Sequence, residues 1–352
     1  MRTVLDQNLD ALMDEPAISW EKFKGQTVFV TGATGLIGQL LLKAFVKANQ
    51  RFGLQMTLLG GARDFRKLQT LMGEHFSEIV YVHYEMSSPI ELRPAVDYIF
   101  HCAAPTSSAY FVSHPSETAQ AIVNSTQHMA EFTKRTRPKA LIFLSSLEVY
   151  GYFDGGLKWV SETDFGSLDP ALVRSSYSEA KRFSETLLTA YRVQYHLPIT
   201  IARLTQLVGP GLNRLDKRVI VEFANAIIDH RDITLVTSGE TVRTYCDTMD
   251  CLSALMIIAL SKGDYAVYNV ANESTLISIR AMAEQLIQAY PDSGTHLLIE
   301  PAENPQALGY NHEVKVGLKA ERLESLGWQA RYSLPASFQR MIACMQEETG
   351  GR

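Results

Sequence analysis

Short apolar runs alternate with amphipathic stretches along the chain from residue 26 to residue 204. The apolar, β-branched runs predict buried strands, and stretches with an apolar residue at every third or fourth position predict helices. The predicted strands span residues 27–31, 56–59, 79–83, 98–102, 140–145 and 199–204. The predicted helices span residues 36–48, 62–72, 115–135 and 175–194. Because such alternation gives a parallel sheet covered by helices on both faces, we expect an α/β fold, a Rossmann-type doubly wound parallel sheet.

The pattern changes after Leu204, where a Gly209-Pro210-Gly211 turn opens a region rich in loops. The helices predicted beyond this turn, with few strands between them, span residues 277–290, 319–326 and 334–346. We therefore expect a smaller, mainly helical C-terminal lobe. The expected division is an N-terminal arm at 1–24, a sheet domain at 25–204 to which 242–270 returns, and the smaller lobe at 205–241 and 271–352.

Composition and charge narrow the kind of protein. Of the 352 residues, 46% are hydrophobic and 20% are charged, which is typical of a soluble globular protein. The net charge of -5 gives no reason to expect nucleic acid as a partner. The four cysteines lack the paired spacing of a metal site, so we expect no metal. No secretory signal is evident and the most apolar run, 251–260, is too short to span a bilayer, so we expect a cytoplasmic protein without a membrane partner.

A glycine-rich turn joins the first predicted strand to the first predicted helix after it. Gly32 permits a tight turn, Gly35 lets the backbone approach a pyrophosphate, and Gly38 lets the helix pack closely on the strand. The helix then offers free N–H groups and a positive dipole end to the phosphates. The turn therefore predicts a bound dinucleotide, NAD(P). The expected cofactor-binding residues of this turn are Gly32, Thr34, Gly35, Leu36, Ile37 and Gly38.

The second predicted strand does not decide between NAD and NADP. An acid at the end of this strand would bind the adenosine ribose and favour NAD. The sequence instead has Arg63 before the first acid, Asp64. Arg63 could pair with the 2′-phosphate of NADP or could lie in solvent, so the cofactor prediction stays at NAD(P) with Arg63 as a candidate contact.

A tyrosine and a lysine four residues apart predict catalysis. Tyr177 and Lys181 fall in one predicted helix and share a face of it. A neighbouring ammonium group favours the phenolate, so we expect a lowered pKa for Tyr177 and a role as acid or base. Ser146 ends the predicted strand 140–145, and such strand ends border the ligand crevice of an α/β sheet, so Ser146 can hydrogen-bond a substrate oxygen beside Tyr177.

Three further residues have competing interpretations. Glu148, two residues after Ser146, is either an auxiliary acid or base or a half-buried carboxylate satisfied by backbone donors. His101 ends a predicted strand and is expected to be a satisfied structural histidine. Glu185 follows Lys181 by one helical turn and could pair with it, but we expect it to be solvated.

These motifs together resemble the extended short-chain dehydrogenase/reductases that modify nucleotide sugars, over about residues 25–345. Within that family the chain looks most like the UDP-glucuronate decarboxylases, on the segments VRSSYSEAKRFSETL and GPGLNRLDKRVIVEF. The other marks of the resemblance are TGATGLIG, His101-Cys102-Ala103-Ala104, SSLEVYG, Arg203 followed by Gly209-Pro210, Arg243 in GETVRTYCDTMD, and Leu326-Gly327-Trp328.

The resemblance implies roles that the residues alone do not give. Ser146, Tyr177 and Lys181 would form the catalytic triad, with Glu148 as an auxiliary acid or base. Ala103, Ala104, Tyr177 and Lys181 would contact the cofactor, with Lys181 at the nicotinamide ribose. The residues implied to bind the nucleotide-sugar substrate, with the two arginines at its diphosphate or sugar, are Pro105, Gln206, Arg218 and Arg243. The family also implies a homodimer built on the helices around Tyr177.

Departures from the family pattern leave the reaction open. Leu147 stands where the 4,6-dehydratases carry an aspartic acid, which argues against dehydration, and Gln206 and Val208 replace a common asparagine and tyrosine. The leading interpretation is a redox-neutral enzyme that acts through a 4-keto sugar, as a decarboxylase or an epimerase. The alternatives are a 4-keto-sugar reductase that consumes NADPH and, less favoured, a non-catalytic dinucleotide sensor.

Overall fold

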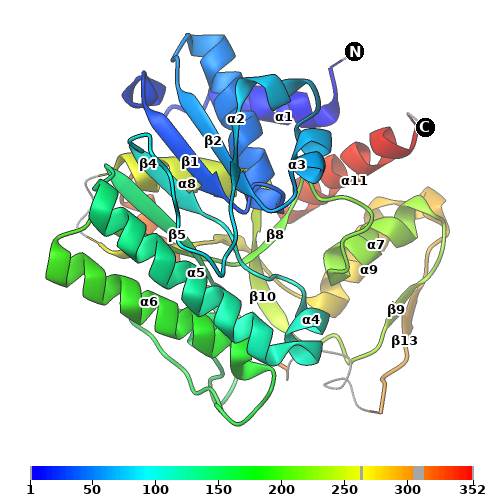
Figure 1. Ribbon diagram of the computed structural model, residues 1–352. Helices are drawn as coiled ribbons and strands as arrows, with labels where there is room; N and C mark the ends of the chain where they lie inside the picture. The colour runs from blue at the N-terminus through cyan, green and yellow to red at the C-terminus, as the bar shows by residue number, and fades with distance from the viewer. Residues whose placement is uncertain (1, 262–264, 304–312, 351–352) are drawn as a thin grey trace.

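The computed structural model describes residues 2–261, 265–303 and 313–350, and its central feature is a parallel sheet of seven strands. The strands lie side by side in the order β3-β2-β1-β4-β5-β7-β11 (Figure 1). Their bounds are β1 Thr27–Thr31, β2 Thr57–Ala62, β3 Val80–His83, β4 Tyr98–His101, β5 Ala140–Ser146, β7 Ile199–Leu204 and β11 Val267–Val270. The expected doubly wound fold is confirmed, and β11 adds one strand to the six that the pattern predicted.

Alternate residues of each strand face opposite helical layers. In β1, Val28 and Val30 belong to the core that α2 (Leu36–Phe52) and α8 (Thr248–Leu260) complete, whereas Phe29 belongs to the core beneath α5 (Pro115–Thr136) and α6 (Ser175–Tyr195). Successive side chains of a strand point to opposite faces, so a strand covered on both faces reads as a continuous apolar run. Figure 1 shows α5 and α6 side by side on one face of the sheet.

The N-terminal segment is part of the core of the sheet. Helix α1 (Val4–Met13) begins with a capping box between Thr3 and Asp6, and a 3-10 turn, η1 (Trp20–Phe23), follows it. Its apolar side chains pack into the same core as β1; they are Leu9, Leu12, Met13, Trp20 and Phe23.

Helix α1 also bonds to the last helix, α11 (Leu334–Gly350). The backbone N–H of Val4 donates to Glu347 Oε2 at 2.8 Å, and Arg340 donates to the side chain of Asn8. Figure 1 accordingly shows the two chain ends near each other.

A second sheet was not expected from the sequence. Its order is β12-β10-β14-β6, with β8 paired to β10. The bounds are β6 Lys158–Val160, β8 Gln206–Val208, β10 Val242–Asp247, β12 Asn272–Ser278 and β14 Lys315–Leu318. The prediction of few strands beyond Leu204 was therefore wrong. Several of these strands have only three or four residues, too few for a period of two to stand out from a loop.

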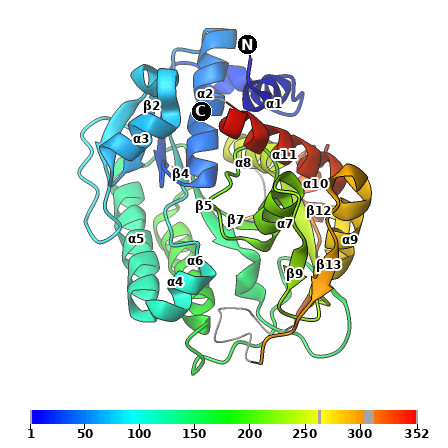
Figure 2. The same ribbon diagram turned by 90° about the vertical axis from the view of Figure 1, so that its right-hand side faces the viewer.

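The helices of the C-terminal part gather beside this second sheet (Figure 2). They are α7 Val219–Ile228, α9 Ile279–Ala289, α10 Glu321–Glu324 and α11, accompanied by the two-stranded pair β9 Ile233–Leu235 and β13 Leu297–Ile299. A separate apolar core forms between α7, α9, α11 and β10. Within the described ranges, no helix is long and apolar enough to cross a membrane.

Two local differences bear on the site. Helix α3 (Phe65–Met72) begins three residues later than predicted, because β2 continues to Ala62 and the side chain of Asp64 caps the helix by accepting from Lys67 N at 2.9 Å. A short helix, α4 (Ser108–Ser113), was not predicted. Its single buried residue, Phe111, gives no periodic signal in the sequence.

Candidate functional site

The glycine turn between β1 and α2 is packed so tightly that two of its positions have no room for a side chain. Gly32 has φ +65°, and a Cβ there would lie 2.8 Å from the backbone N of Ala103. A Cβ on Gly38 would lie 2.8 Å from the carbonyl carbon of Gly32 and closer still to its oxygen. Real Cβ atoms essentially never come this close to backbone. The turn thus requires glycine at both positions, and it rests against the Cys102-Ala103 segment that follows β4.

The start of α2 is available to an anion. Gly35 is the N-cap, is exposed, and makes no side-chain capping bond; the first turn contains no acid. The positive end of the helix dipole and the first N–H groups, at Leu36 and Ile37, are therefore not satisfied by a local carboxylate. An uncapped helix start behind a glycine turn fits a diphosphate. Thr34 is half-buried within the turn.

The end of β2 carries no acid in this structure. Arg63 is exposed, and its backbone carbonyl accepts from Tyr81 Oη at 3.2 Å. The first acid, Asp64, is engaged as the cap of α3. The local geometry is thus as the sequence suggested, with an exposed arginine and no ribose-binding carboxylate at the strand end.

Three predicted residues meet where β5 ends and α6 begins. Ser146 lies close enough to Tyr177 to favour ionisation of its phenol, and the Ser146 hydroxyl accepts from Glu148 N at 3.3 Å. Tyr177 is 7% exposed, and its ring stacks on Phe111 of α4 with centroids 4.3 Å apart. Because β5 is a central strand, its carboxyl end lies in the crevice region where doubly wound folds bind ligands.

Glu148 is bound by side chains rather than by backbone donors. Arg174 donates from Nη1 to Oε2 and from Nη2 to Oε1, both at 2.9 Å, and Ser178 Oγ donates to Oε2 at 3.1 Å. Both ionic side chains are largely enclosed, with 18% of Glu148 and 16% of Arg174 exposed. Sequence reasoning missed Arg174, although it precedes Tyr177 by three residues and so lies one helical turn away.

The expected lowering of the Tyr177 pKa was wrong. Burial raises the pKa of Tyr177 well above its usual range, and the neighbouring Glu148 carboxylate raises it further, against smaller opposing effects of Ser146 and Arg174. Lys181 instead donates to the backbone carbonyl of Leu144 at 2.7 Å. Burial lowers the pKa of Lys181 to about 8, opposed by Glu185 and Cys102. The cation whose charge lowers the pKa of Tyr177 is therefore Arg174.

His101 is structural, as expected. Its Nδ1 bonds Thr31 Oγ1 at 2.7 Å and its Nε2 bonds Ser125 Oγ at 3.1 Å, so both ring nitrogens have partners. Burial, with help from the charge of Lys181, lowers the pKa of His101 to about 3. The ring therefore stays neutral and fixes the end of β4 beside the glycine turn.

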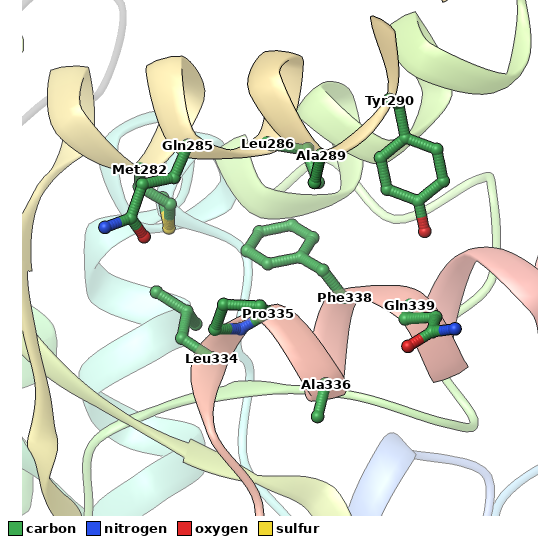
Figure 3. A pocket seen from close by; sticks show the side chains of 10 residues that line it. All are labelled: Met282, Gln285, Leu286, Ala289, Tyr290, Leu334, Pro335, Ala336, Phe338 and Gln339. Atoms are coloured by element: carbon green, nitrogen blue, oxygen red, sulfur yellow. The ribbon is translucent and has the colours of Figure 1, made fainter. Parts of the chain in front are cut away.

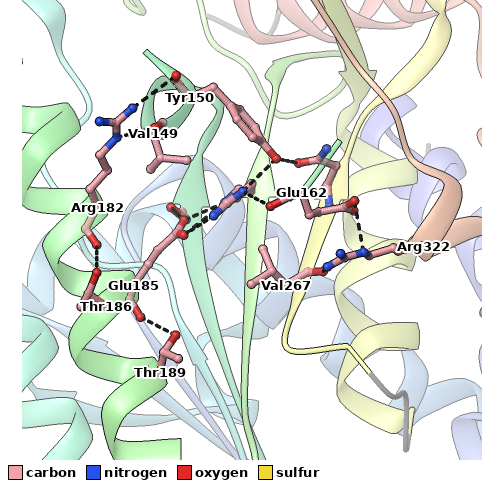
Figure 4. A network of polar contacts seen from close by, with 12 residues as sticks. Val149, Tyr150, Glu162, Arg182, Glu185, Thr186, Thr189, Val267 and Arg322 are labelled. Carbon is pink, nitrogen blue, oxygen red and sulfur yellow. Dashed lines mark hydrogen bonds and ion pairs between the residues drawn. The ribbon is translucent and has the colours of Figure 1, made fainter. Parts of the chain in front are cut away.

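The expectation that Glu185 is solvated was wrong. Its carboxylate pairs with Arg203 of β7, with Oε2 2.6 Å from Nη2, and both side chains are almost fully buried. Ser145 Oγ donates to the same carboxylate at 2.5 Å. The chain of bonds continues through Tyr150 to Asn269 of β11 (Figure 4). A buried charge is stable only when paired and hydrogen-bonded, and this network meets that condition.

The network also extends into the C-terminal part of the chain. Glu162, which lies after β6, accepts from Asn269 N at 2.8 Å and pairs with Arg322 of α10 (Figure 4). It thus joins the parallel sheet to elements beside the second sheet.

The predicted substrate residues have different environments. Arg243 on β10 is 8% exposed, and its Nε has no hydrogen-bond partner among the described residues. Burial raises the pKa of Tyr152, and Arg174, Glu148 and Arg243 all act on its charge, so Arg243 lies within electrostatic reach of a residue beside the Tyr177 cluster.

Of the remaining predicted residues, only Ala104 packs with this cluster in the part of the chain that the structure describes. Arg218, at the start of α7, pairs with Asp216 at 2.6 Å. Gln206 of β8 lies opposite Tyr245 of β10. Pro105 is half-buried in the segment after β4, and Ala104 packs in the small apolar cluster that contains Tyr177 and Phe111.

A groove of about 350 Å³ lies elsewhere, between α9 and α11. Figure 3 shows Leu334 and Phe338 of α11 facing Met282 and Leu286 of α9 across it. None of its lining residues belongs to the predicted site. Within the described ranges, no cluster of three or more His, Cys, Asp or Glu side chains could hold a metal ion.

The sheet topology and the glycine turn define a dinucleotide-binding α/β fold. The family model for the NAD dependent epimerase/dehydratase family matches residues 28–271, and the chain belongs to this family. The chain is 28% identical over 311 residues to UDP-glucuronic acid decarboxylase 6 of Arabidopsis thaliana, covering 87% of this chain and 85% of the relative. It is 25% identical over 325 residues to UDP-glucuronic acid decarboxylase 1 of Xenopus tropicalis, covering 91% and 72%.

Solved structures support the fold. The UDP-glucose 4-epimerase of Thermotoga maritima, solved with UDP-glucose, superposes with a TM-score of 0.76 at 18% identity, covering 92% of this chain and 100% of that one. The UDP-glucuronic acid 4-epimerase of Bacillus cereus, solved with NAD, gives a TM-score of 0.71 at 18% identity, covering 92% and 99%. The predicted family resemblance and the enzyme class are therefore confirmed.

Proposed function

We propose that this protein is an NAD-dependent enzyme that oxidises a nucleotide sugar at C4 and then decarboxylates or epimerises it. The observation that carries the proposal is the placement of Ser146, at the carboxyl end of β5, close enough to act on the Tyr177 phenol, in a chain whose β1–α2 turn leaves no room for a side chain at Gly32 or Gly38. The relatives named UDP-glucuronic acid decarboxylase support a UDP-sugar as the first substrate to test.

The glycine turn and the segment after β4 would hold the cofactor. Gly32, Gly35 and the first turn of α2 would receive the diphosphate, Ala103 and Ala104 would border the nicotinamide side, and Lys181 would hold the nicotinamide ribose. Bound NAD supplies a hydride acceptor at the sugar C4 and later returns the hydride. NAD is favoured because the family is NAD-dependent, whereas the exposed Arg63 favours NADP.

Tyr177 would take the proton of the C4 hydroxyl, and Ser146 would hydrogen-bond the same oxygen as it becomes a carbonyl. The resulting 4-keto group can accept the electron pair of the C5–carboxylate bond as an enolate, so the carboxylate can leave as carbon dioxide and C5 then takes up a proton in its place. In an epimerase, Glu148 would instead move a proton at C5. Tyr177 would finally return its proton to the C4 oxygen. In this mechanism the hydroxyl groups of Tyr177 and Ser146 lie at C4, and the carboxylate of Glu148 lies near C5.

Arg243 would bind the substrate diphosphate. A buried guanidinium whose Nε has no partner in the described structure is costly unless an acceptor arrives, and a diphosphate oxygen provides one. Arg218 would lose part of its pairing with Asp216 if it bound the substrate, so we assign it a weaker contact. Gln206 and Pro105 would line the sugar site.

The apolar side chain of Leu147, which follows Ser146, disfavours a dehydration reaction. Leu147 packs partly buried against the apolar cluster of Val149 and Tyr150, so it offers no proton for a leaving C6 hydroxyl. The second candidate function is an NADPH-dependent 4-keto-sugar reductase, which exposed Arg63 favours. We further propose a cytoplasmic homodimer, supported by the exposed apolar side chains of Phe183 and Val193 on α6.

The test is incubation with a panel of UDP-, CDP-, GDP- and dTDP-sugars, including UDP-glucuronate, with products followed by mass spectrometry and proton NMR. Carbon dioxide loss identifies a decarboxylase, and deuterium uptake without mass loss identifies an epimerase at C5. Stoichiometric NADPH oxidation supports the reductase instead. No turnover of any sugar, with NAD bound, would contradict the proposal.

A further inference from the structure

Arg174 binds the carboxylate of Glu148, the acidic group whose charge acts on Tyr177. It sits at the start of α6, and its two terminal nitrogens reach the two oxygens of Glu148, each at 2.9 Å. Two parallel N–H···O bonds fix both the position and the orientation of a carboxylate. Ser178, four residues further along the same helix, donates a third bond at 3.1 Å. Glu148 is thus held by a helix face that also carries Tyr177.

A carboxylate in this place opposes any ionisation of Tyr177. Two negative charges a few ångströms apart in a buried site disfavour each other strongly. Lys181 is directed elsewhere, since its Nζ donates to Leu144 O and lies 4.5 Å from the centre of the Phe143 ring. The cation that can offset Glu148 beside Tyr177 is therefore Arg174.

Phe111 fixes the relative positions of the arginine and the tyrosine. Its ring stacks on Tyr177 at 4.3 Å between centroids, and the guanidinium of Arg174 lies over the same ring at 5.0 Å. Phe111 is 2% exposed and comes from α4, a separate element from α6. Contact with one rigid aromatic ring limits how far Arg174 can move away from Tyr177.

The other titratable groups around Tyr177 do not supply a positive charge that could take the place of Arg174. Tyr152 lies in the segment after η3 and is influenced by Glu148, Arg174 and Arg243 together. From β4, His101 is buried and neutral, and burial raises the pKa of the Cys102 thiol, so neither brings a charge near neutral pH. The residues of α4 and α5 that share an apolar cluster with Tyr177 carry no charge; they are Phe111, Ala119, Ile122 and Val123.

We propose that Arg174 is a positioning residue for the proposed reaction: it holds the Glu148 carboxylate in place beside Tyr177 and balances its charge, so that Tyr177 can ionise when NAD is bound. The inference rests on the proposed function for its catalytic consequence. Its electrostatic part concerns only this chain and NAD.

The test compares Arg174→Met, Arg174→Lys, Glu148→Gln and the double variant Arg174→Met/Glu148→Gln in the full chain. The first readout is the pH dependence of kcat. Loss of a cation near a buried group shifts a pKa by about one unit or more, so Arg174→Met moves the acidic limb about one unit to higher pH and lowers kcat about tenfold below it. The lysine variant keeps the charge and shifts the limb less. The double variant removes both charges and returns the limb toward that of Glu148→Gln.

The second readout needs no sugar substrate. The positive nicotinamide ring of NAD favours the phenolate, so NAD binding releases a proton, measured by calorimetry in buffers of different ionisation enthalpy. The release is absent in Tyr177→Phe, reaches its full value about one pH unit higher in Arg174→Met, and is restored in the double variant. Arg192→Met, which removes an arginine from the far end of α6, serves as the control for net charge.

The outcomes separate the two proposals. A uniform loss of rate at every pH, with unchanged proton release, shows that Arg174 is only structural and overturns the inference. The absence of Tyr177-dependent proton release in the wild-type protein overturns it as well. If no sugar is turned over but the proton release depends on Arg174 as described, the inference stands and the proposed function fails.

Discussion

Replacing Gly38 by alanine tests the cofactor turn directly. In an open helix this change stabilises by about 1 kcal/mol, because alanine has the better helix propensity. Here the added Cβ would lie 2.8 Å from the Gly32 carbonyl carbon and 3.0 Å from the Cα of Ala33, so backbone must move. Overpacking of this kind costs about 1–3 kcal/mol, which exceeds the helix gain. After the helix gain is subtracted, we expect a net loss of up to about 2 kcal/mol in the free energy of unfolding.

The same movement should weaken NAD binding. Pushing the start of α2 away from Gly32 displaces the N–H groups that the diphosphate needs, so we expect the Kd of NAD to rise about tenfold or more, in line with the loss of about one good charged hydrogen bond. Urea unfolding measures the first effect and titration calorimetry the second. Gly53→Ala is the matched control, since Gly53 ends α2 with φ +60° and open space around it. It should destabilise through strain alone and leave NAD affinity unchanged. An unchanged Kd in the Gly38 variant would refute the reasoning.

Three further predictions concern buried polar groups. Tyr177→Phe should lower kcat by about 10²–10⁴-fold, the usual contribution of a general acid or base, while the variant still binds NAD; retained turnover would remove the tyrosine from the mechanism. Glu185→Gln leaves the Arg203 charge buried and unpaired, so the free energy of unfolding should fall by about 3–5 kcal/mol in a urea titration, and a change below 1 kcal/mol would count against the ion pair. His101 has a folded pKa lowered to about 3, below its unfolded value, so the unfolded chain binds more protons between about pH 3 and 6.5 and stability falls as the pH drops through that window. The slope should be about 1.4 kcal/mol per pH unit steeper in the wild-type protein than in His101→Gln, and equal slopes would contradict a neutral buried ring.

The sequence alone predicts those elements whose signal lies in adjacent residues. The strand 27–31, the glycine turn and the helix after it each carry a signal in adjacent residues, and Ser146 and Tyr177 follow from strand and helix ends. The structure brings Ser146 close enough to Tyr177 to affect the pKa of its phenol.

The remainder depends on contacts between distant segments. Glu185 looked like an exposed helix residue because its partner, Arg203, lies on another element. Phe111 gave no signal because α4 is short, and the stacking on Tyr177 spans 66 positions in sequence from 111 to 177. The pKa of Tyr177 was misjudged because spacing on a helix shows which residues share a face but not how deeply they are buried.

The hydrogen bonds between α1 and α11 have a consequence for the order in which the chain folds. Val4 and Glu347 are 343 positions apart, and Asn8 and Arg340 are 332 apart. Contacts of such long range form only after the intervening sheet has brought the two ends together, because closing so long a loop has an entropic cost that earlier contacts must offset. Joining of the first and last helices is therefore a late event in folding, and a fluorescent pair placed on them would report arrival at the native topology.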